Sequence, residues 1–212
     1  MPIAPLARVG TRELMLDAAE RLYAQKGIRA VSLREIALAA NQRNNGAAQY
    51  HFGDAVGLIR AVYVRRGAVV NERREALLDE CLRRLDATLV DVLRCYVAPL
   101  GEQVTVGNWY VPFLARLQAD HERDELLSGV GPEVTTAYER VRRRLQVDEL
   151  AGLPRRVGAS RWRLTVNLAI DALADHQFVL ARSARHPMTV EELVDDLAAS
   201  MAGFLTAPTP LA

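Results

Sequence analysis

Amide and guanidinium side chains are concentrated in one short stretch of the sequence, which contains Arg43, Asn44, Asn45 and Gln49. An amide can form two hydrogen bonds with adenine in the major groove of DNA, and a guanidinium can form two with guanine. The small Ala47 within the stretch would let a helix approach another surface closely. The stretch therefore predicts contact with DNA, and ordinary solvated polar residues are the alternative.

The titratable residues do not form a recognised catalytic or metal-binding pattern. Four histidines are widely spaced along the chain: His51, His121, His176 and His186. Their neighbours give no zinc-binding His-Glu-x-x-His helix, and the sequence has no phosphate loop or serine nucleophile elbow. Asp171, Asp175 and His176 could bind a metal if they faced inward, but a polar patch is favoured. We therefore predict no enzyme, no metal and no cofactor, and an all-helical enzyme is the least favoured alternative.

Two short amphipathic helices are expected to position the amide side chains. Ser32 and Glu35 have the spacing of a capping box, which starts a helix over residues 33–40 with one apolar face. A polar turn at 41–43 follows, and residues 44–51 form the second helix. Helices this short need neighbours to be stable. The pattern is that of a helix-turn-helix, whose second helix enters the major groove.

Helical periodicity continues to the end of the chain, and no strand is predicted. A second capping box, Thr189 to Glu192, starts the last helix. Gly and Pro clusters separate the other expected helices, which lie near residues 54–85, 86–103, 108–127, 132–150 and 160–184. We predict an all-α protein with a helix-turn-helix domain over 1–60, a helical domain over 61–206 and a loose tail over 207–212.

At these residues the sequence resembles the tetracycline-repressor (TetR) family of bacterial transcriptional regulators. The resemblance rests on Leu16-Asp17-Ala18-Ala19 with a downstream Gly27, on the Ile36-Ala37 pair, and on Tyr50-His51-Phe52. It covers about the first quarter of the chain. It implies a three-helix DNA-binding domain followed by a helical domain for ligand binding and dimerisation. The implied function is that of a dimeric regulator, most often a repressor, that releases operator DNA when a small effector binds.

Two features depart from the family's pattern. The turn from Ala40 to Asn44 is one residue longer than usual and lacks a small apolar residue, which leaves the exact base contacts open. Asp54 is followed by Ala55 and Val56, where the family often has a phosphate-binding lysine. Packing or capping of helix carbonyls is the alternative role for Tyr50 and His51. The candidate DNA contacts are Arg12, Ser32, Arg34, Arg43, Asn44, Asn45, Ala47, Gln49, Tyr50 and His51.

The segment 160–184 is apolar on nearly all sides. Beyond its main stripe, Trp162, Leu164, Leu168, Ala172 and Phe178 leave little polar surface. A helix of this kind must be covered on two sides. We therefore predict that it forms a four-helix bundle with the last helix and the same pair from a second chain, with a buried monomer core as the alternative. The predicted interface residues are Val166, Ile170, Leu173, Leu197, Met201 and Phe204.

Aromatic and isolated polar residues of the middle helices are the candidate effector contacts: Trp109, Tyr110, Phe113, Tyr138, Asn167 and His176. A mostly apolar cavity with few polar groups is typical of small-molecule sites, although aromatics at helical spacing are also typical of a core. The long helix over 54–85 is the predicted mechanical link to the DNA-binding unit. The alternative function is that of an architectural DNA-binding protein, which needs neither cavity nor effector.

The charge distribution agrees with a polyanionic partner for the N-terminal part. Residues 1–75 contain 12 Lys and Arg against 7 Asp and Glu, whereas the remainder contains 15 against 19. Only Cys81 and Cys95 are present, and they do not suggest a disulfide framework. No apolar run reaches the roughly 18 to 20 residues that span a bilayer, and residues 1–10 lack the apolar segment of a signal peptide. We therefore expect a cytoplasmic protein.

Overall fold

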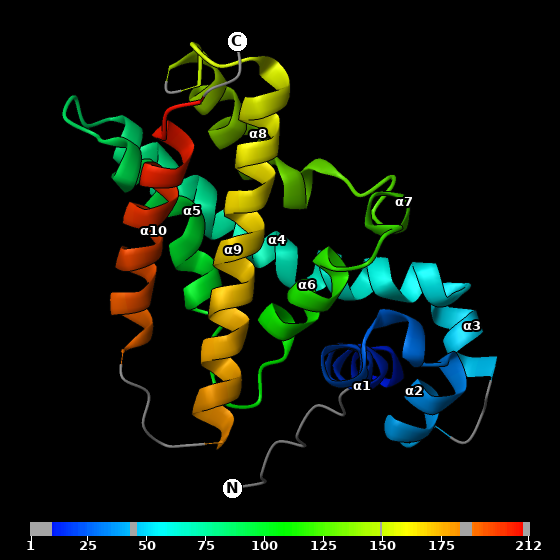
Figure 1. Ribbon diagram of the computed structural model, residues 1–212. Helices are drawn as coiled ribbons and strands as arrows, with labels where there is room; N and C mark the ends of the chain where they lie inside the picture. Colours follow the sequence, from blue (N-terminus) through cyan, green and yellow to red (C-terminus); the bar gives the residue numbers. More distant parts are fainter. Residues whose placement is uncertain (1–9, 43–45, 149, 183–187, 210–212) are drawn as a thin grey trace, which may run out of the picture.

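The computed structural model describes residues 10–42, 46–148, 150–182 and 188–209. Every regular element within these residues is helical, so the all-α prediction is confirmed. A three-helix unit lies at one end of the molecule and a larger helical body at the other, and one long helix passes from the first to the second (Figure 1).

The three-helix unit consists of α1 (Thr11–Lys26), α2 (Leu33–Ala39) and α3 (Gly46–Phe52), with a 3-10 turn at Ile28–Ala30. Ile36 and Ala48 are fully buried in its core, where the small Ala48 allows a close approach between helices. The predicted capping box of α2 is only half formed. The Ser32 hydroxyl accepts a hydrogen bond from the Glu35 amide at 3.2 Å. The Glu35 carboxylate pairs with Lys26 instead of returning to Ser32.

The turn after α2 begins with Asn41 in a left-handed conformation, at a φ of 56°. Its amide donates to the Leu38 carbonyl at 3.0 Å, and the Gln42 amide donates to the Ala37 carbonyl at 2.9 Å. This pair of bonds is a Schellman motif, and asparagine is among the few non-glycine residues that accept the required φ. The motif sets the direction in which the chain leaves α2.

The long helix α4 (Ala55–Leu82) contacts α1 and α3 in the three-helix unit and α5 and α8 in the body. Its first turn is capped by the Asp54 carboxylate, which accepts a hydrogen bond from the Gly57 amide at 2.7 Å. The predicted domain boundary between residues 60 and 61 falls inside this continuous helix. The two parts of the molecule therefore share α4.

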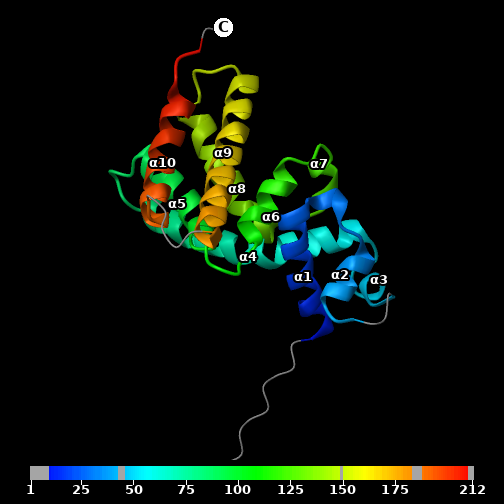
Figure 2. The same cartoon turned by 60° about the horizontal axis from the view of Figure 1, so that its bottom comes forward.

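Among its described residues the body has six further helices: α5 (Leu89–Gly101), α6 (Tyr110–Gln118), α7 (Arg123–Leu126), α8 (Pro132–Val147), α9 (Arg155–Arg182) and α10 (Val190–Thr206). Helices α9 and α10 lie side by side, and α10 also packs against α5 (Figure 2). The capping box at the start of α10 is complete, since the Thr189 hydroxyl accepts from the Glu192 amide and the Glu192 carboxylate accepts from the Thr189 amide.

Two expected boundaries were wrong. The single helix expected over 108–127 is divided into α6 and α7, because the Asp120 carboxylate accepts a hydrogen bond from the Glu122 amide at 2.9 Å and so stabilises a turn. The break expected over 152–158 is shorter, because Pro154 leads directly into α9. The Gly158 amide donates to the Pro154 carbonyl at 3.1 Å, which places this glycine within the helix.

Replacing Gly101 by alanine is expected to destabilise the fold. A Cβ atom at Gly101 would lie 2.6 Å from Val194 Cγ2 on α10, and the stiff valine cannot yield without moving its helix. Overpacking of this kind costs about 1 to 3 kcal/mol of unfolding free energy, which urea denaturation measures. Gly158→Ala is the matched control, because its Cβ would meet Leu150 at an ordinary 3.5 Å. Equal stability of the two variants would contradict the close contact between α5 and α10.

Candidate nucleic-acid interface and ligand cavity

Helix α3 presents a polar, exposed surface at the end of the three-helix unit. Gln49 is exposed, and the side chain of Tyr50 is 86% exposed, although tyrosine usually packs when it can. Ala48 is buried in the core, where its small side chain lets α3 approach the other two helices closely. Ala47 is half-buried and remains partly accessible from outside the unit. The exposed side of α3 can therefore contact a groove without rearrangement of the core.

The other predicted DNA contacts belong to α1, to α2 with its cap, and to α3 itself. Arg34 is exposed on α2, and Ser32 is exposed at the start of that helix. The Arg12 guanidinium lies 5.5 Å from the centre of the Phe52 ring and pairs with Glu13 at 3.1 Å. His51 is half-buried, with its ring 5.1 Å from that of Tyr50. Three further predicted contacts lie outside the described residues: Arg43, Asn44 and Asn45.

The body contains a cavity of about 410 Å³ between α4, α5, α6, α8 and α9, which is within the range of small-molecule sites. Of the six candidate effector contacts, Tyr110, Tyr138 and Asn167 line it. The Asn167 Oδ1 atom is buried and has no hydrogen-bond partner among the described residues. An unpartnered acceptor at a cavity wall is available to a ligand.

The other three candidate effector contacts lie outside this cavity. Phe113 is fully buried beside the rings of Tyr23 and Tyr110, at 6.1 and 6.3 Å between ring centres. His176 is buried in α9 away from the cavity wall. Trp109 precedes α6, and its indole lines a separate hollow against α1. Aromatic residues of the core and of the cavity wall are both largely buried in this domain. Their spacing in the sequence therefore could not distinguish the two groups.

Sequence reasoning missed the buried cation of the cavity wall, Arg74 on α4. Arg74 is only 8% exposed. Its Nε donates to the Tyr96 carbonyl at 2.7 Å, and its guanidinium carbon lies 3.9 Å from the centre of the Tyr96 ring. Burial raises the pKa of Tyr96 and of Tyr110, so both hydroxyls stay neutral and neither offsets the charge of Arg74.

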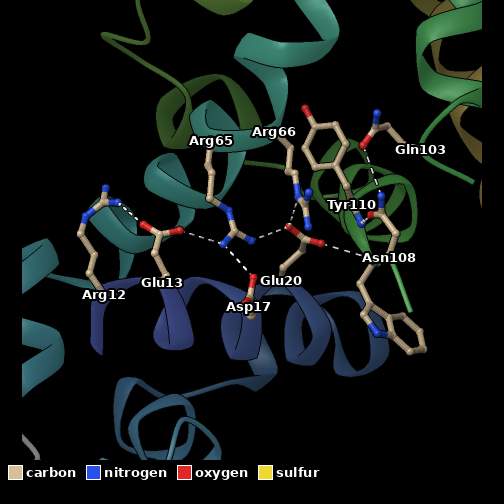
Figure 3. Close-up of polar contacts among 10 residues, drawn as sticks. Arg12, Glu13, Asp17, Glu20, Arg65, Arg66, Gln103, Asn108 and Tyr110 are labelled. Carbon is tan, nitrogen blue, oxygen red and sulfur yellow. Dashed lines mark hydrogen bonds and ion pairs between the residues drawn. The ribbon is translucent and has the colours of Figure 1, made fainter. Parts of the chain in front are cut away.

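A buried carboxylate, Glu20, joins α1 to α4 and to the start of α6. The side chain of Glu20 is 4% exposed, and its Oε2 accepts hydrogen bonds from Arg65 at 3.0 Å and from Arg66 at 3.3 Å. Its Oε1 accepts from the Trp109 backbone amide at 3.3 Å. Figure 3 shows the carboxylates of α1 directed toward these two arginines of α4. Because Tyr110 follows Trp109 and lines the cavity, this network runs from the cavity wall to the three-helix unit.

A second ionic contact fixes the three-helix unit to the body. Arg29 donates two hydrogen bonds to Asp120, at 2.9 and 3.0 Å, and one to Glu122 at 2.7 Å. These bonds from Arg29 hold the pKa of Asp120 below its usual value. Arg60 on α4 donates to the Leu126 carbonyl at 2.7 Å. The sequence contains one signal for the ionic contacts of α1. Glu20 is a charged residue between Ala19 and Leu22, on the buried side of that helix.

Five of the six predicted interface residues are buried within the subunit by its own helices: Val166, Ile170, Leu173, Leu197 and Met201. Phe204 on α10 is 43% exposed. On α9 the exposed apolar residues are Leu164 and Leu168, at 46% and 49%. They lie four residues apart and so share a face of the helix. The three exposed residues Leu164, Leu168 and Phe204, on the adjacent helices α9 and α10, are referred to as the apolar face.

Metal and membrane features are absent from the part of the chain that the structure describes. No three His, Cys, Asp or Glu side chains come together as metal ligands there, and Asp171 and Asp175 are exposed while His176 is buried. In the same residues, no helix has both the length and the apolar character needed to cross a bilayer.

The three-helix unit, its exposed α3 and the helical body together define the fold of a helix-turn-helix domain followed by a helical C-terminal domain. Residues 15–62 match the family of bacterial regulatory proteins called the tetR family, and this segment belongs to it. The resemblance of the sequence to that family is confirmed. The matched segment is thus that of a bacterial regulatory protein of this family.

Solved structures extend the likeness of the fold to the whole chain. The fatty acid degradation regulator FadR from Bacillus halodurans is 14% identical, with a TM-score of 0.59, and the alignment covers 90% of this chain and 97% of that one. A transcriptional regulator of the TerR/AcrR family from Aquifex aeolicus VF5 is 19% identical, with a TM-score of 0.50 and coverage of 91% and 98%. At these identities the likeness is one of fold. A search of curated proteins gave no match.

Proposed function

We propose that the chain is a cytoplasmic, homodimeric repressor that binds a pseudo-palindromic operator and releases it when a small effector enters the 410 Å³ cavity. The observation that carries this proposal is the continuity of α4, which contacts the DNA-reading unit and also lines the cavity through Tyr63, Gly67 and Arg74. Occupation of the cavity therefore acts directly on the helix that supports α1 and α3.

Exposed residues on and around α3 support the DNA contact. Gln49 and Tyr50 are exposed and form no side-chain hydrogen bond with another described residue, and Arg34 is exposed on α2. The Arg12–Glu13 pair is half-exposed and so contributes at most about 1 kcal/mol, which leaves the guanidinium free to exchange its carboxylate for a phosphate. In a dimer, two such units contact half-sites roughly 34 Å apart along the duplex.

The apolar face supports the dimer. Leu164, Leu168 and Phe204 expose apolar surface on two adjacent helices of the body, and packing these helices against a second copy removes that surface from water. The dimer contact thereby uses the outer side of α9. The residues first expected there, such as Val166 and Leu173, instead stabilise the subunit from within.

The network at Glu20 supports the coupling between ligand and DNA. A ligand that moves Tyr110 also moves the Trp109 amide, which donates to Glu20 on α1. A ligand can shift operator affinity only by its difference in affinity for the two states. A fiftyfold loss of operator affinity corresponds to about 2.3 kcal/mol, and the operator then weakens ligand binding by the same factor. An architectural protein has no need of a cavity, so the cavity favours the regulated function over that alternative.

Substitution of Gln49 and Tyr50 tests the DNA contact. Gln49→Ala is expected to weaken binding to the operator by about 1 to 3 kcal/mol and to leave binding to random duplex nearly unchanged, because an amide that reads a base carries sequence information. Tyr50→Phe is expected to weaken both complexes, because a hydroxyl that binds phosphate does not distinguish sequences. Fluorescence anisotropy on the operator and on a scrambled duplex, at several salt concentrations, measures both effects.

Val69→Ala is the control for this experiment, because Val69 is exposed on α4 outside the three-helix unit. The control should leave both affinities and the steep salt dependence unchanged. Base reading by Gln49 is wrong if its substitution weakens both duplexes equally. The whole proposal fails if the wild-type dimer binds no duplex better than random DNA.

A further inference from the structure

A buried positive charge without a counter-ion lies in the wall of the cavity. Arg74 forms no ion pair with any carboxylate among the described residues, although it is only 8% exposed. Burying an unpaired charge is costly, so proteins usually pair such a group or use it to bind a ligand. Arg65, a partly buried cation of the same helix, follows the first course, because it pairs with Asp17 and Glu20.

The position of the Arg74 guanidinium is fixed while two of its nitrogens stay available. Nε donates to the Tyr96 carbonyl at 2.7 Å, and the guanidinium lies over the Tyr96 ring. Nη1 and Nη2 donate to no acceptor among the described residues, and Arg74 lines the cavity. A guanidinium held in this way offers two parallel donors, the arrangement that matches a carboxylate.

The remaining charges of the cavity wall do not neutralise Arg74. The two acidic residues of the wall are already paired, Glu139 with Arg142 at 2.6 Å and Asp124 with Arg123 at 2.5 Å. Arg163 is exposed at the wall and has no ion pair among the described residues. The wall therefore carries an excess of positive charge.

The rest of the cavity wall is apolar and aromatic, with Leu100, Leu114, Val134, Val166, Ile170 and Trp162. Such a wall favours an apolar body on the ligand, since each buried methylene contributes about 0.8 kcal/mol. The Asn167 Oδ1 atom adds one acceptor without a partner. The wall therefore combines a buried cation that has no counter-ion among the described residues with apolar surface.

We propose that the natural effector is an apolar carboxylate, whose acid group pairs with Arg74 and whose aliphatic or aromatic body fills the cavity. This inference rests on the proposed function, because it names the chemical class of the effector at the same cavity. It narrows the expected ligand from a largely apolar molecule to an anionic one.

Calorimetry on the full-length wild-type protein tests the class of ligand. Decanoate and 2-naphthoate are the probes for an aliphatic and an aromatic body, and decan-1-ol and 2-naphthalenemethanol are their uncharged counterparts. At least one carboxylate is expected to bind about tenfold or more tightly than its alcohol, because a charge-assisted bond to a buried group contributes more than a neutral one. Decylammonium is expected to bind more weakly than the alcohol.

The Arg74→Gln variant tests the residue. It is expected to lose the tenfold preference for the carboxylate over the alcohol while it still binds the alcohol. Arg73→Gln is the matched control, because Arg73 is the neighbouring residue on α4, half-exposed and paired with Glu102 outside the cavity. Arg74→Lys keeps the charge and is expected to keep part of the preference. If Arg74→Gln does not fold, the preference of the wild-type protein still decides the class.

The inference is overturned if neither carboxylate binds, if the alcohols bind as tightly as the carboxylates, or if Arg74→Gln keeps the preference. Operator release is measured separately, by anisotropy with the same probes. A carboxylate that binds through Arg74 and leaves the operator complex intact would support the anion site and contradict the proposed repressor mechanism. Release of the operator by the alcohols alone would support the mechanism and overturn the anion site.

Discussion

Replacing Leu168 by glutamate is expected to convert the dimer into a monomer and to weaken operator binding by roughly a hundredfold or more. Leu168 is 49% exposed on the apolar face, where a partner helix would bury the new charge without a counter-ion. A monomer binds one half-site at a time. It therefore loses the gain in affinity from a second, tethered contact, which is about 10²-fold to 10⁴-fold. Light scattering gives the mass, and anisotropy gives the operator affinity.

Val69→Glu is the control for the dimer experiment. Val69 is 59% exposed on α4, so its substitution adds the same charge to the same protein away from the apolar face. The control should remain a dimer with unchanged operator affinity. If Leu168→Glu stays dimeric at micromolar concentration, the subunits contact each other elsewhere. If the wild-type protein is a monomer, the proposal that a dimer binds two half-sites is wrong.

Glu20→Gln is expected to lower the unfolding free energy by about 1 to 3 kcal/mol and to weaken the coupling between cavity and operator. The isosteric amide has no negative charge and has an NH2 donor in place of one acceptor oxygen, so it cannot accept hydrogen bonds from Arg65, Arg66 and the Trp109 amide together. Residues along a coupling network change the coupling energy by about 0.5 to 2 kcal/mol. Urea denaturation measures the stability, and operator titrations with and without a cavity-binding carboxylate measure the coupling.

Glu13→Gln provides the comparison on the same helix. Glu13 also pairs with Arg65, at 3.3 Å, but its side chain is 46% exposed and the pair contributes at most about 1 kcal/mol. Its substitution should therefore leave both the stability and the coupling almost unchanged. If Glu20→Gln loses stability and keeps full coupling, Glu20 supports the fold without transmitting the ligand's effect.

Local patterns in the sequence were sufficient for the helices and for the DNA-reading unit. The apolar stripe of α1, the Ser32 cap and the Tyr-His-Phe end of α3 act over distances of one or two helical turns, where sequence spacing corresponds directly to position in space. The helix-turn-helix and the complete cap at Thr189 were predicted for this reason. The broken helix near Asp120 was missed, because the turn is stabilised by contact with Arg29, 91 residues earlier.

The residues that line the cavity and those that form the apolar face could be identified only in part from the sequence. Their positions depend on which sides of each helix are covered by the rest of the chain. Val166 and Leu168 are both apolar and two residues apart in α9, yet one is buried within the subunit and the other is exposed. Periodicity identifies both faces of such a helix without saying which neighbour each one meets. Arg74 resembles any solvated arginine of a long helix until α5 is known to bury it.

The length of α4 multiplies small movements. At 1.5 Å per residue its 28 residues span about 42 Å. A tilt of about 5° about the end of α4 in the body would displace the end beside α3 by nearly 4 Å, close to the 3.4 Å rise of one base pair. Two subunits tilting in opposite senses would change the separation of their reading helices by about two base-pair steps. Because α4 is this long, a ligand that causes only small side-chain movements in the cavity could tilt it enough to prevent the dimer from contacting both half-sites.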